Sequence, residues 1–167
     1  GLSATQLAHA MGARVIALDV SEERLARAKE LGADVLINPK TTENVVQAIR
    51  DATHGRGAHL SMDTSSSPLA RAQAAKCVRT WGRVCYVGEG DTVTLDVSND
   101  LLRRQVTVIG SWTFSTVGQL ECARFIADRG IDVDALFTQT WRLDQADEAY
   151  RLFDRQTTGK AYFDPAA

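Results

Sequence analysis

The stretch Val15-Ile16-Ala17-Leu18-Asp19 sets a continuous apolar run directly before an acid, and Ser21-Glu22-Glu23 follow it closely. A short apolar run without alternation is typical of a strand that is buried on both faces of a parallel sheet. Ser21 has the side chain of a helix N-cap, and the glutamates suit a first helical turn, where the helix dipole favours negative charge. The stretch therefore predicts a buried strand that ends at Asp19 and passes into a helix.

The same alternation continues along the chain. Leu25, Ala28 and Leu31 give the helix after Ser21 an apolar stripe, and Gly32 is placed to end it. Further strands are predicted at Val35–Ile37, Ala58–Asp63, 83–88 and 106–110. Further helices are predicted at 2–11, from Thr42 to near Gly55, from Pro68 to about Trp81 with Gly82 as its stop, at Leu101-Leu102, and over about 116–129 and 144–157.

Strands that alternate with helices predict right-handed crossovers and one parallel sheet with helices on both faces. The five strands make residues 1–167 a doubly wound, Rossmann-like α/β domain for binding a dinucleotide. In its strand order 3-2-1-4-5-6 the first strand is central, and the chain begins directly with a helix after Gly1. We therefore expect an incomplete domain, with 15–19 and 35–37 separated from the later strands. Preceding residues, another chain or a rearranged sheet that uses 161–164 would fill the gap.

Composition and charge limit the classes of function. The 167 residues are 44% hydrophobic and 24% charged, with a net charge of -2, which is typical of one ordinary soluble domain. No basic stripe is present, so we expect no nucleic-acid partner. No apolar run approaches the ~20 residues that cross a bilayer, so we expect no membrane partner.

The cysteines Cys77, Cys85 and Cys122 form no C-x-x-C pair, and the histidines are scattered. This spacing argues against a zinc site made from this chain alone. We expect the cysteines to be small buried side chains. Free thiols without a disulfide pattern also fit a reducing cytoplasm.

Ligands of doubly wound sheets bind beyond the carboxyl ends of the strands, and Asp19 is the most informative residue there. An acid about 20 residues beyond a glycine loop accepts hydrogen bonds from the adenosine ribose and repels the 2′-phosphate of NADP. Gly1 stands at that distance as the last glycine of such a loop would. The other interpretation of Asp19, as a helix N-cap or a solvated acid, is equally open at this point.

Small or polar residues end the other strands. Val87-Gly88 and Gly110-Ser111 could let a flat ring lie against the backbone, or they are ordinary turn residues. Thr64-Ser65-Ser66-Ser67 could bind a ligand, but we favour a capping role for the helix that Pro68 opens.

Together these segments resemble the coenzyme domain of the medium-chain dehydrogenases, in particular the zinc-type alcohol dehydrogenases. The resemblance extends over nearly the whole chain. It rests on 1–13 followed by 15–21, on Leu31-Gly32-Ala33-Asp34 leading to Ile37-Asn38-Pro39, on Gly82-Arg83-Val84 leading to Val87-Gly88, and on Thr158-Gly159-Lys160-Ala161.

The resemblance implies a two-domain enzyme that oxidises an alcohol or polyol with NAD, assisted by zinc. Zinc and the catalytic residues would lie in an absent catalytic domain, against which about 136–143 and 160–165 would pack. No residue of the chain is therefore assigned a catalytic or metal-binding role, and the chain alone is expected to be inactive and to hold no zinc.

The resemblance also places cofactor contacts by position. Gly1 and Leu2 would approach the pyrophosphate, and Asp19 would bind the adenosine ribose with Arg24 beside it. Thr64 and Ser65 would border the adenine or ribose. The nicotinamide carboxamide would meet Val87, with Gly88 beside it, and the backbone of Ile109, Gly110 and Ser111.

Three alternatives remain open: a zinc-free, NADPH-dependent quinone or enoyl reductase of the same superfamily, a non-enzymatic nucleotide-binding module, and a methyltransferase-like fold. Asp19 argues against the first, because NADPH sites prefer basic or small residues near the 2′-phosphate. The Gly159-Lys160-Ala161 ending and the segments outside the alternation favour a dehydrogenase over the other two. Thr92–Val97 alternates polar and apolar residues near a sheet edge, so we also expect a homo-oligomer formed by edge pairing.

Overall fold

The computed structural model describes residues 1–155 and 159–166. The chain divides into two compact units. Unit 1 consists of Gly1 and 39–114, and unit 2 consists of 2–38 and 115–167. Each unit is described by itself.

Unit 1 is built on a parallel sheet in the order β3-β4-β5, formed by β3 (Ala58–Asp63), β4 (Val78–Tyr86) and β5 (Thr107–Gly110). The helices α3 (Val45–Ala52) and α4 (Pro68–Cys77) precede and follow β3, and a π-helical turn (Val97–Leu101) and a 3-10 turn (Leu102–Arg104) precede β5. Asp63, Tyr86 and Gly110 pair in register. The carboxyl ends of the strands therefore meet at one edge of the sheet.

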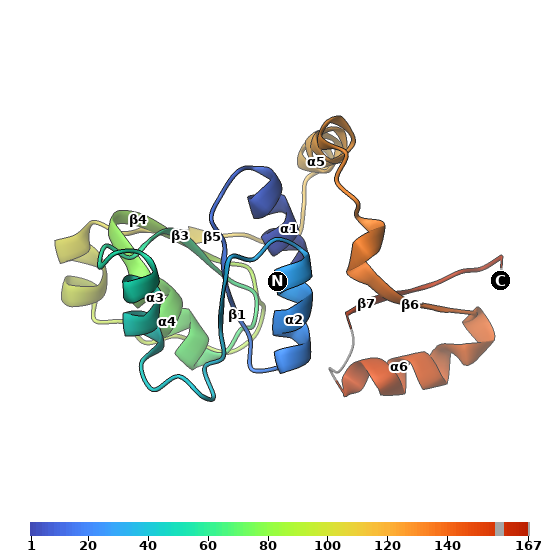
Figure 1. Cartoon of the computed structure of the whole chain (residues 1–167), viewed down its shortest axis with the longest axis horizontal. Coiled ribbons are helices and arrows are strands. Elements are labelled where there is room, and N and C mark those ends of the chain that lie inside the picture. The colour runs from blue at the N-terminus through green and yellow to red at the C-terminus, as the bar shows by residue number, and fades with distance from the viewer. Residues whose placement is uncertain (156–158, 167) are drawn as a thin grey trace. The chain divides into compact units, whose positions relative to one another are not determined.

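The core of unit 1 lies between α4 and the sheet. Figure 1 shows α4 running alongside β3 and β4, with α3 next to it. Ala75 and Val84 are completely buried, and the Ser61 hydroxyl donates a hydrogen bond to the Ala74 carbonyl at 2.7 Å. Strand and helix are thus joined by apolar packing and by one side-chain bond across the layer.

Unit 2 begins with α1 (Leu2–Ala10), β1 (Ile16–Leu18), α2 (Glu22–Glu30) and β2 (Val35–Ile37), and β1 pairs with β2 in parallel. The predicted stripe of α2 is confirmed, because Leu25, Ala28 and Leu31 are all buried. Ser21 is its N-cap, as predicted, and accepts a hydrogen bond from the Arg24 backbone N–H at 3.4 Å.

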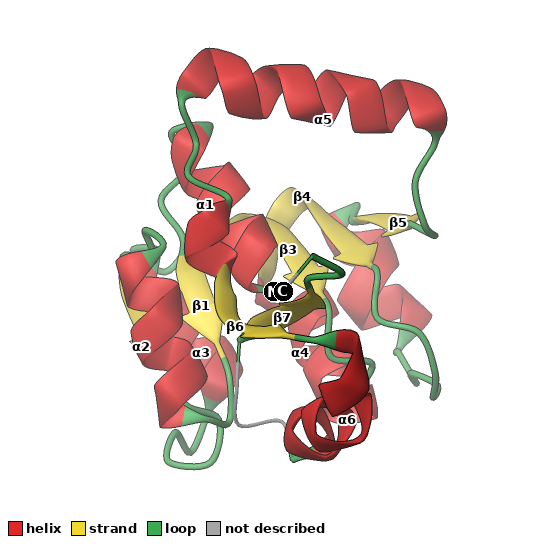
Figure 2. Ribbon diagram, turned by 90° about the vertical axis from the view of Figure 1, so that its right-hand side faces the viewer, coloured by secondary structure: helices red, strands yellow, loops and turns green. Residues whose placement is uncertain are grey.

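Unit 2 also contains α5 (Thr116–Arg129), β6 (Phe137–Trp141), α6 (Ala146–Asp154) and β7 (Lys160–Phe163), with 3-10 turns at Asp134–Leu136 and Leu143–Gln145. Figure 2 shows β6 and β7 side by side, and the two strands pair in parallel. Gln6 on α1 donates to the Asp132 carbonyl at 2.6 Å, and Arg27 on α2 donates to the Ala135 carbonyl. These bonds join the segment before β6 to the two N-terminal helices.

The predicted strands are all present, but the single sheet is not. The described strands form three separate sheets, β1-β2, β3-β4-β5 and β6-β7. The break falls between β1 and β3, where the strand order places a missing first strand. The suggested use of 161–164 to fill this gap is wrong, because β7 pairs with β6. The segments 136–143 and 160–165 are extended, as expected, over the bounds of β6 and β7.

The expectation that Val15–Leu18 is buried on both faces is also wrong. Leu18 is 38% exposed and every residue of β5 is exposed. β1 has a hydrogen-bonded neighbour only in β2, and β5 only in β4, among the described residues. A parallel strand is buried on both sides only when neighbouring strands and helical layers enclose it.

The helix after Pro68 ends at Cys77, four residues earlier than predicted, and β4 begins at once. Trp81 has a positive φ of 61° and lies in an irregular stretch of β4, where the register with β3 shifts. Gly82 does not stop a helix. A Cβ there would lie 2.7 Å from the Arg79 carbonyl oxygen, so Gly82 permits a tight backbone turn inside the strand.

Smaller corrections concern the ends of elements and the cysteines. α3 begins at Val45 with Asn44 as its N-cap, not at Thr42. No strand is found over 92–97, because 92–96 have no regular structure and the π-helical turn begins at Val97. The helix predicted over 144–157 is α6 within 146–154, and residues 156–158 lie outside the described residues. Cys77 and Cys85 are buried as expected, whereas Cys122 is exposed.

Candidate functional site

Asp19 lies in unit 2 directly after β1, where the backbone turns into α2. Its Oδ1 accepts hydrogen bonds from the Ser21 backbone N–H at 2.9 Å and from Arg24 Nε at 3.0 Å. Because Ser21 caps α2, Arg24 lies in the first helical turn, within reach of the end of the strand. The local sequence therefore fixes the position of the carboxylate.

The second oxygen of this carboxylate is available. None of the residues that the structure describes donates a hydrogen bond to Asp19 Oδ2, and the Asp19 side chain is 32% exposed. An ionised carboxylate is an acceptor only. The site can thus accept hydrogen bonds from the hydroxyls of a ribose and would repel a phosphate in the same place.

A second group of predicted site residues meets in unit 1 at the carboxyl edge of the sheet. The backbone N–H groups of Val87 and Gly88 both donate to the Asp63 carbonyl, at 2.9 and 3.1 Å, and Ser111 N–H donates to the Tyr86 carbonyl at 3.0 Å. Pairing therefore continues just beyond the strands. It brings together the loops that contain Thr64, Ser65, Val87, Gly88 and Ser111, next to Ile109 and Gly110 of β5.

The glycines of this edge differ in the space around them. A Cβ on Gly88 would lie 2.6 Å from the backbone nitrogen of Ser66 and 3.0 Å from the carbonyl carbon of Thr64. A Cβ on Gly110 would meet no atom within 4 Å, and one on Gly1 would touch Thr64 Oγ1 at 3.4 Å. Gly88 is thus required for close packing of two loops, whereas Gly110 leaves open surface beside its backbone.

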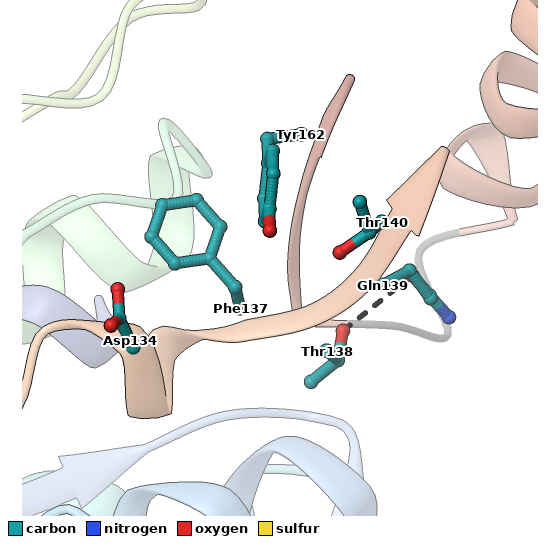
Figure 3. A pocket seen from close by; sticks show the side chains of 6 residues that line it. All are labelled: Asp134, Phe137, Thr138, Gln139, Thr140 and Tyr162. Atoms are coloured by element: carbon teal, nitrogen blue, oxygen red, sulfur yellow. Dashed lines mark hydrogen bonds between the residues drawn. The ribbon is translucent and has the colours of Figure 1, made fainter. Parts of the chain in front are cut away.

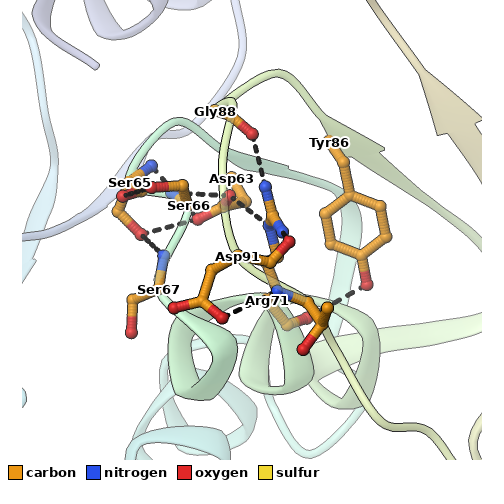
Figure 4. Close-up of polar contacts among 9 residues, drawn as sticks. Asp63, Ser65, Ser66, Ser67, Arg71, Tyr86, Gly88 and Asp91 are labelled. Atoms are coloured by element: carbon orange, nitrogen blue, oxygen red, sulfur yellow. Dashed lines mark hydrogen bonds and ion pairs between the residues drawn. The ribbon is translucent and has the colours of Figure 1, made fainter.

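Below this edge lies a buried ion pair that the sequence did not single out. Asp63 and Arg71 have side chains that are 3% and 10% exposed, with 3.5 Å between Asp63 Oδ2 and Arg71 Nε. That Nε makes no hydrogen bond with any described residue. The two terminal nitrogens of Arg71 donate to the carbonyls of Gly88 at 2.5 Å and Asp91 at 2.6 Å (Figure 4).

The serines after β3 bind Asp63 more than they cap α4. Ser65 donates to Asp63 Oδ1 through its N–H at 3.2 Å and its hydroxyl at 2.7 Å, and Ser66 N–H donates to Oδ2 at 3.2 Å. Ser67 occupies the N-cap position, yet its side chain makes no capping bond. The favoured capping role is therefore wrong for the Ser67 side chain.

Tyr86 completes the cluster from the end of β4. Burial, and secondly the negative charge of Asp63, raise the pKa of Tyr86. The hydroxyl is protonated at neutral pH and donates a hydrogen bond to the Arg71 carbonyl at 3.1 Å. The guanidinium of Arg71 is thus bound to the loop that contains Gly88, and its backbone carbonyl is bound to Tyr86 at the end of β4.

The described part of the chain contains neither a metal-binding cluster nor a membrane-spanning helix. Within it, no three His, Cys, Asp or Glu side chains are grouped so that they could hold a metal ion. No helix among the described residues is both long and apolar enough to cross a bilayer.

With this geometry established, residues 1–128 match the zinc-binding dehydrogenase family. This chain belongs to that family. The α/β fold with parallel strands agrees with the family's coenzyme-binding part, which is the part that the chain covers.

Curated relatives in the family are dehydrogenases or resemble them. The zinc-type alcohol dehydrogenase-like protein YphC of Escherichia coli is 38% identical over 96% of this chain and 45% of its own length. An L-threonine 3-dehydrogenase of Symbiobacterium thermophilum is 33% identical over 99% of this chain and 48% of its own. The chain thus spans about half the length of the relatives that it matches.

Solved structures show the same likeness. An alcohol dehydrogenase of Thermotoga maritima superposes with a TM-score of 0.87 at 27% identity, over 98% of this chain and 47% of that one. A benzyl alcohol dehydrogenase of Acinetobacter calcoaceticus gives 0.84 at 30% identity, over 98% and 46%. The Rossmann-like fold predicted from the sequence is confirmed.

The structure distributes the predicted site residues over both units. Unit 2 contains Leu2, at the first turn of α1, and the Asp19–Arg24 pair. Unit 1 contains Gly1 and the residues of the sheet edge. Sequence reasoning missed the roles of Asp63 and Arg71. Asp63 gave one usable signal, because it follows an apolar strand in the same way as Asp19.

Proposed function

We propose that this chain binds NAD for a dehydrogenase that oxidises an alcohol or polyol. The observation that carries the proposal is the Asp19 carboxylate, fixed by Arg24 at the end of β1 with one oxygen available. Membership of the zinc-binding dehydrogenase family supports the reaction class.

The residues of the chain bind and orient the cofactor in this proposal. Asp19 accepts hydrogen bonds from the adenosine ribose, while Gly1 and Leu2 lie near the pyrophosphate. Thr64 and Ser65 border the adenosine half, and Val87, Ile109, Gly110 and Ser111 present backbone groups to the nicotinamide carboxamide. Bound NAD supplies the hydride chemistry itself, so these residues act by position.

The described residues form no group of side chains that could hold a metal ion. If zinc assists the reaction, its ligands lie in a part of the protein outside this chain. The chain alone is then inactive, as the resemblance implies.

The surface formed by β6, β7 and α6 supports the proposal of a further domain. An open hollow of about 590 Å³ lies beside β6. Figure 3 shows the side chains that line it, which are Phe137, Tyr162, Asp134, Thr138, Gln139 and Thr140. A second, largely apolar hollow of about 180 Å³ lies against α6. Leu143 in the turn before α6, and Tyr150, Phe153 and Tyr162 of these elements, are exposed. Exposed apolar patches mark contact sites, and we propose that the segments 136–143 and 160–165 pack on the catalytic domain here.

We further propose that the protein works as a homo-oligomer. β5 is exposed throughout and has β4 as its only paired neighbour among the described residues. An open edge strand is a template for pairing with a second chain. This edge replaces the segment 92–97 as the better candidate, because 92–97 forms no strand.

The cofactor preference tests the proposal. NADH and NADPH are titrated against the full-length wild-type protein, Asp19→Ala and the control Glu23→Ala, which removes an exposed acid from the helix that follows Asp19, α2. Like charges at close range cost a few kcal/mol, so we expect wild type to prefer NADH by on the order of a hundredfold. Asp19→Ala should abolish most of this preference and Glu23→Ala should keep it.

Equal affinity of the wild type for both cofactors would favour the NADPH-dependent reductase instead. An unchanged preference in Asp19→Ala would show that another residue reads the ribose. Absence of binding to either cofactor by the wild type would contradict the proposed function as a whole.

A further inference from the structure

We propose that Asp63 and Arg71 are positioning residues that hold the two cofactor-facing loops of unit 1 in one fixed arrangement. The loops are 64–67, after β3, and 88–91, after β4. The inference rests on the proposed function, because it concerns how the same site binds NAD.

Asp63 holds the first loop. Its carboxylate accepts three hydrogen bonds from the two residues that follow Thr64, at 2.7 to 3.2 Å, and so fixes the backbone of Ser65 and Ser66. Hydrogen bonds to an ionised acceptor are about twice as strong as neutral ones. The loop that borders the adenosine half thus depends on the carboxylate of Asp63.

Arg71 holds the second loop. Its planar guanidinium reaches two backbone carbonyls from one side chain, those of Gly88 and Asp91. Its own carbonyl accepts the Tyr86 hydroxyl from the end of β4. The loop that follows the nicotinamide-facing Val87 thus depends on Arg71, which comes from α4 and lies away from the cofactor edge.

The two halves are coupled. Asp63 and Arg71 form a buried ion pair, so neither charge can be removed without leaving the other desolvated and unpaired. The loops also touch directly, because the backbone of Ser66 fills the space where Gly88 would have a side chain. Figure 4 shows the pair between the serine loop and Gly88. This cluster therefore sets the distance between the loop that borders the adenosine half of the cofactor and the loop beside its nicotinamide half.

Arg71→Lys is the sharpest variant. Lysine keeps a positive charge beside Asp63, but it lacks the planar fork that reaches both carbonyls at once. The serine loop keeps its bonds to Asp63, whereas loop 88–91 loses its anchor. NADH contacts both sides, and ADP-ribose lacks the nicotinamide ring.

In the full-length protein we expect Arg71→Lys to raise the dissociation constant of NADH about tenfold, or about 1.4 kcal/mol, and that of ADP-ribose less than twofold. NADH binding is followed by its fluorescence and ADP-ribose by competition. Asp63→Asn, which loosens the serine loop as well, should weaken both ligands. The control Arg103→Lys alters an exposed arginine that binds the Asn99 side chain, and it should change neither.

Unfolding midpoints are measured for each variant, because a merely structural role would lower stability without separating the two ligands. Equal weakening of NADH and ADP-ribose by Arg71→Lys, or no change in either, would overturn the positioning role. If Arg71→Lys does not fold, Asp63→Asn decides, and unchanged binding of both ligands there overturns it. Loss of NADH binding in the wild type would instead refute the proposed function, and the inference with it.

Discussion

Cys77, the last residue of α4, makes the stability of unit 1 fall at alkaline pH. The thiol is 4% exposed, and burial raises its pKa to about 11. In an unfolded chain the thiol has its ordinary, lower pKa, so the unfolded state ionises first as pH rises. The folded state is therefore stabilised by the neutral thiol below about pH 9, and this contribution is lost as pH rises toward 11.

We predict that the protein loses about 2–3 kcal/mol of unfolding free energy from this thiol between pH 8.5 and 11. Cys77→Ala should start from a lower stability, because a buried sulfur is deleted, and should lose less over that range. Tyr86, whose pKa is also raised, titrates in both proteins, so their difference isolates Cys77. Urea unfolding at each pH measures it, with the exposed Cys122→Ala as control. Parallel pH profiles for wild type and Cys77→Ala would contradict the prediction.

Asp19 and Asp63 show how far single residues can be interpreted from sequence. Both end predicted strands, and in the sequence only the distance from Gly1 distinguishes Asp19 from Asp63. Asp19 keeps an oxygen available and is partly exposed, whereas Asp63 is buried under three hydrogen bonds and an ion pair. The difference depends on Arg71, which is near Asp63 only after α4 folds back onto β3. The order of residues along the chain does not reveal that contact between Asp63 and Arg71.

Among the elements, most strands were predicted well, but β4 begins five residues before the predicted start at Arg83, and the helix ends were predicted less well. β2 and β3 have the predicted bounds, because an apolar run between polar turns is a local signal. The ends of α3 and α4 depend on contacts that the chain makes later. In α4 the helix stops at Cys77 because Val78 already pairs with Ala58 of β3. The sequence interpretation placed the start of α3 at Thr42, whereas in the structure Asn44 is its N-cap.

The first turn of α3 provides a direct test. Asn44 Oδ1 accepts a hydrogen bond from the Gln47 backbone N–H at 3.0 Å. Loss of an N-cap bond costs roughly 0.5–2 kcal/mol, so Asn44→Ala should lower the free energy of unfolding by about 1 kcal/mol. Thr42→Ala changes the residue that the sequence favoured and should have little effect. Chemical denaturation of both variants decides, and a larger loss for Thr42→Ala would show that the helix begins where the sequence placed it.

At the scale of the whole molecule, the strand order separates two sheets. β2-β1 and β3-β4-β5 have the neighbours that a doubly wound fold requires, but β1 and β3 each have one unpaired edge among the described residues. Leu60 and Met62 of β3 are also about half exposed, at 54% and 46%. Local sequence patterns were enough to predict which strands are neighbours within each sheet, since crossovers between parallel strands are right-handed and short. They could not say what covers the remaining edges, because no local pattern names a partner for them.

We predict that one further strand pairs with β1 and β3 and is required for full stability. Each unsatisfied backbone group costs about 1–3 kcal/mol when buried, and a domain has only about 5–15 kcal/mol of stability in total. The 167-residue chain should therefore unfold at a much lower urea concentration than a version extended by the residues that precede Gly1 in the full-length protein. A matched extension with its apolar residues changed to Gly and Ser should give no gain. Hydrogen exchange should show new protection at amides of β1 and β3 in the first extension alone, since a strand can pair only where backbone groups are unpaired. Equal unfolding midpoints for all three proteins would mean that the two sheets are complete as they stand.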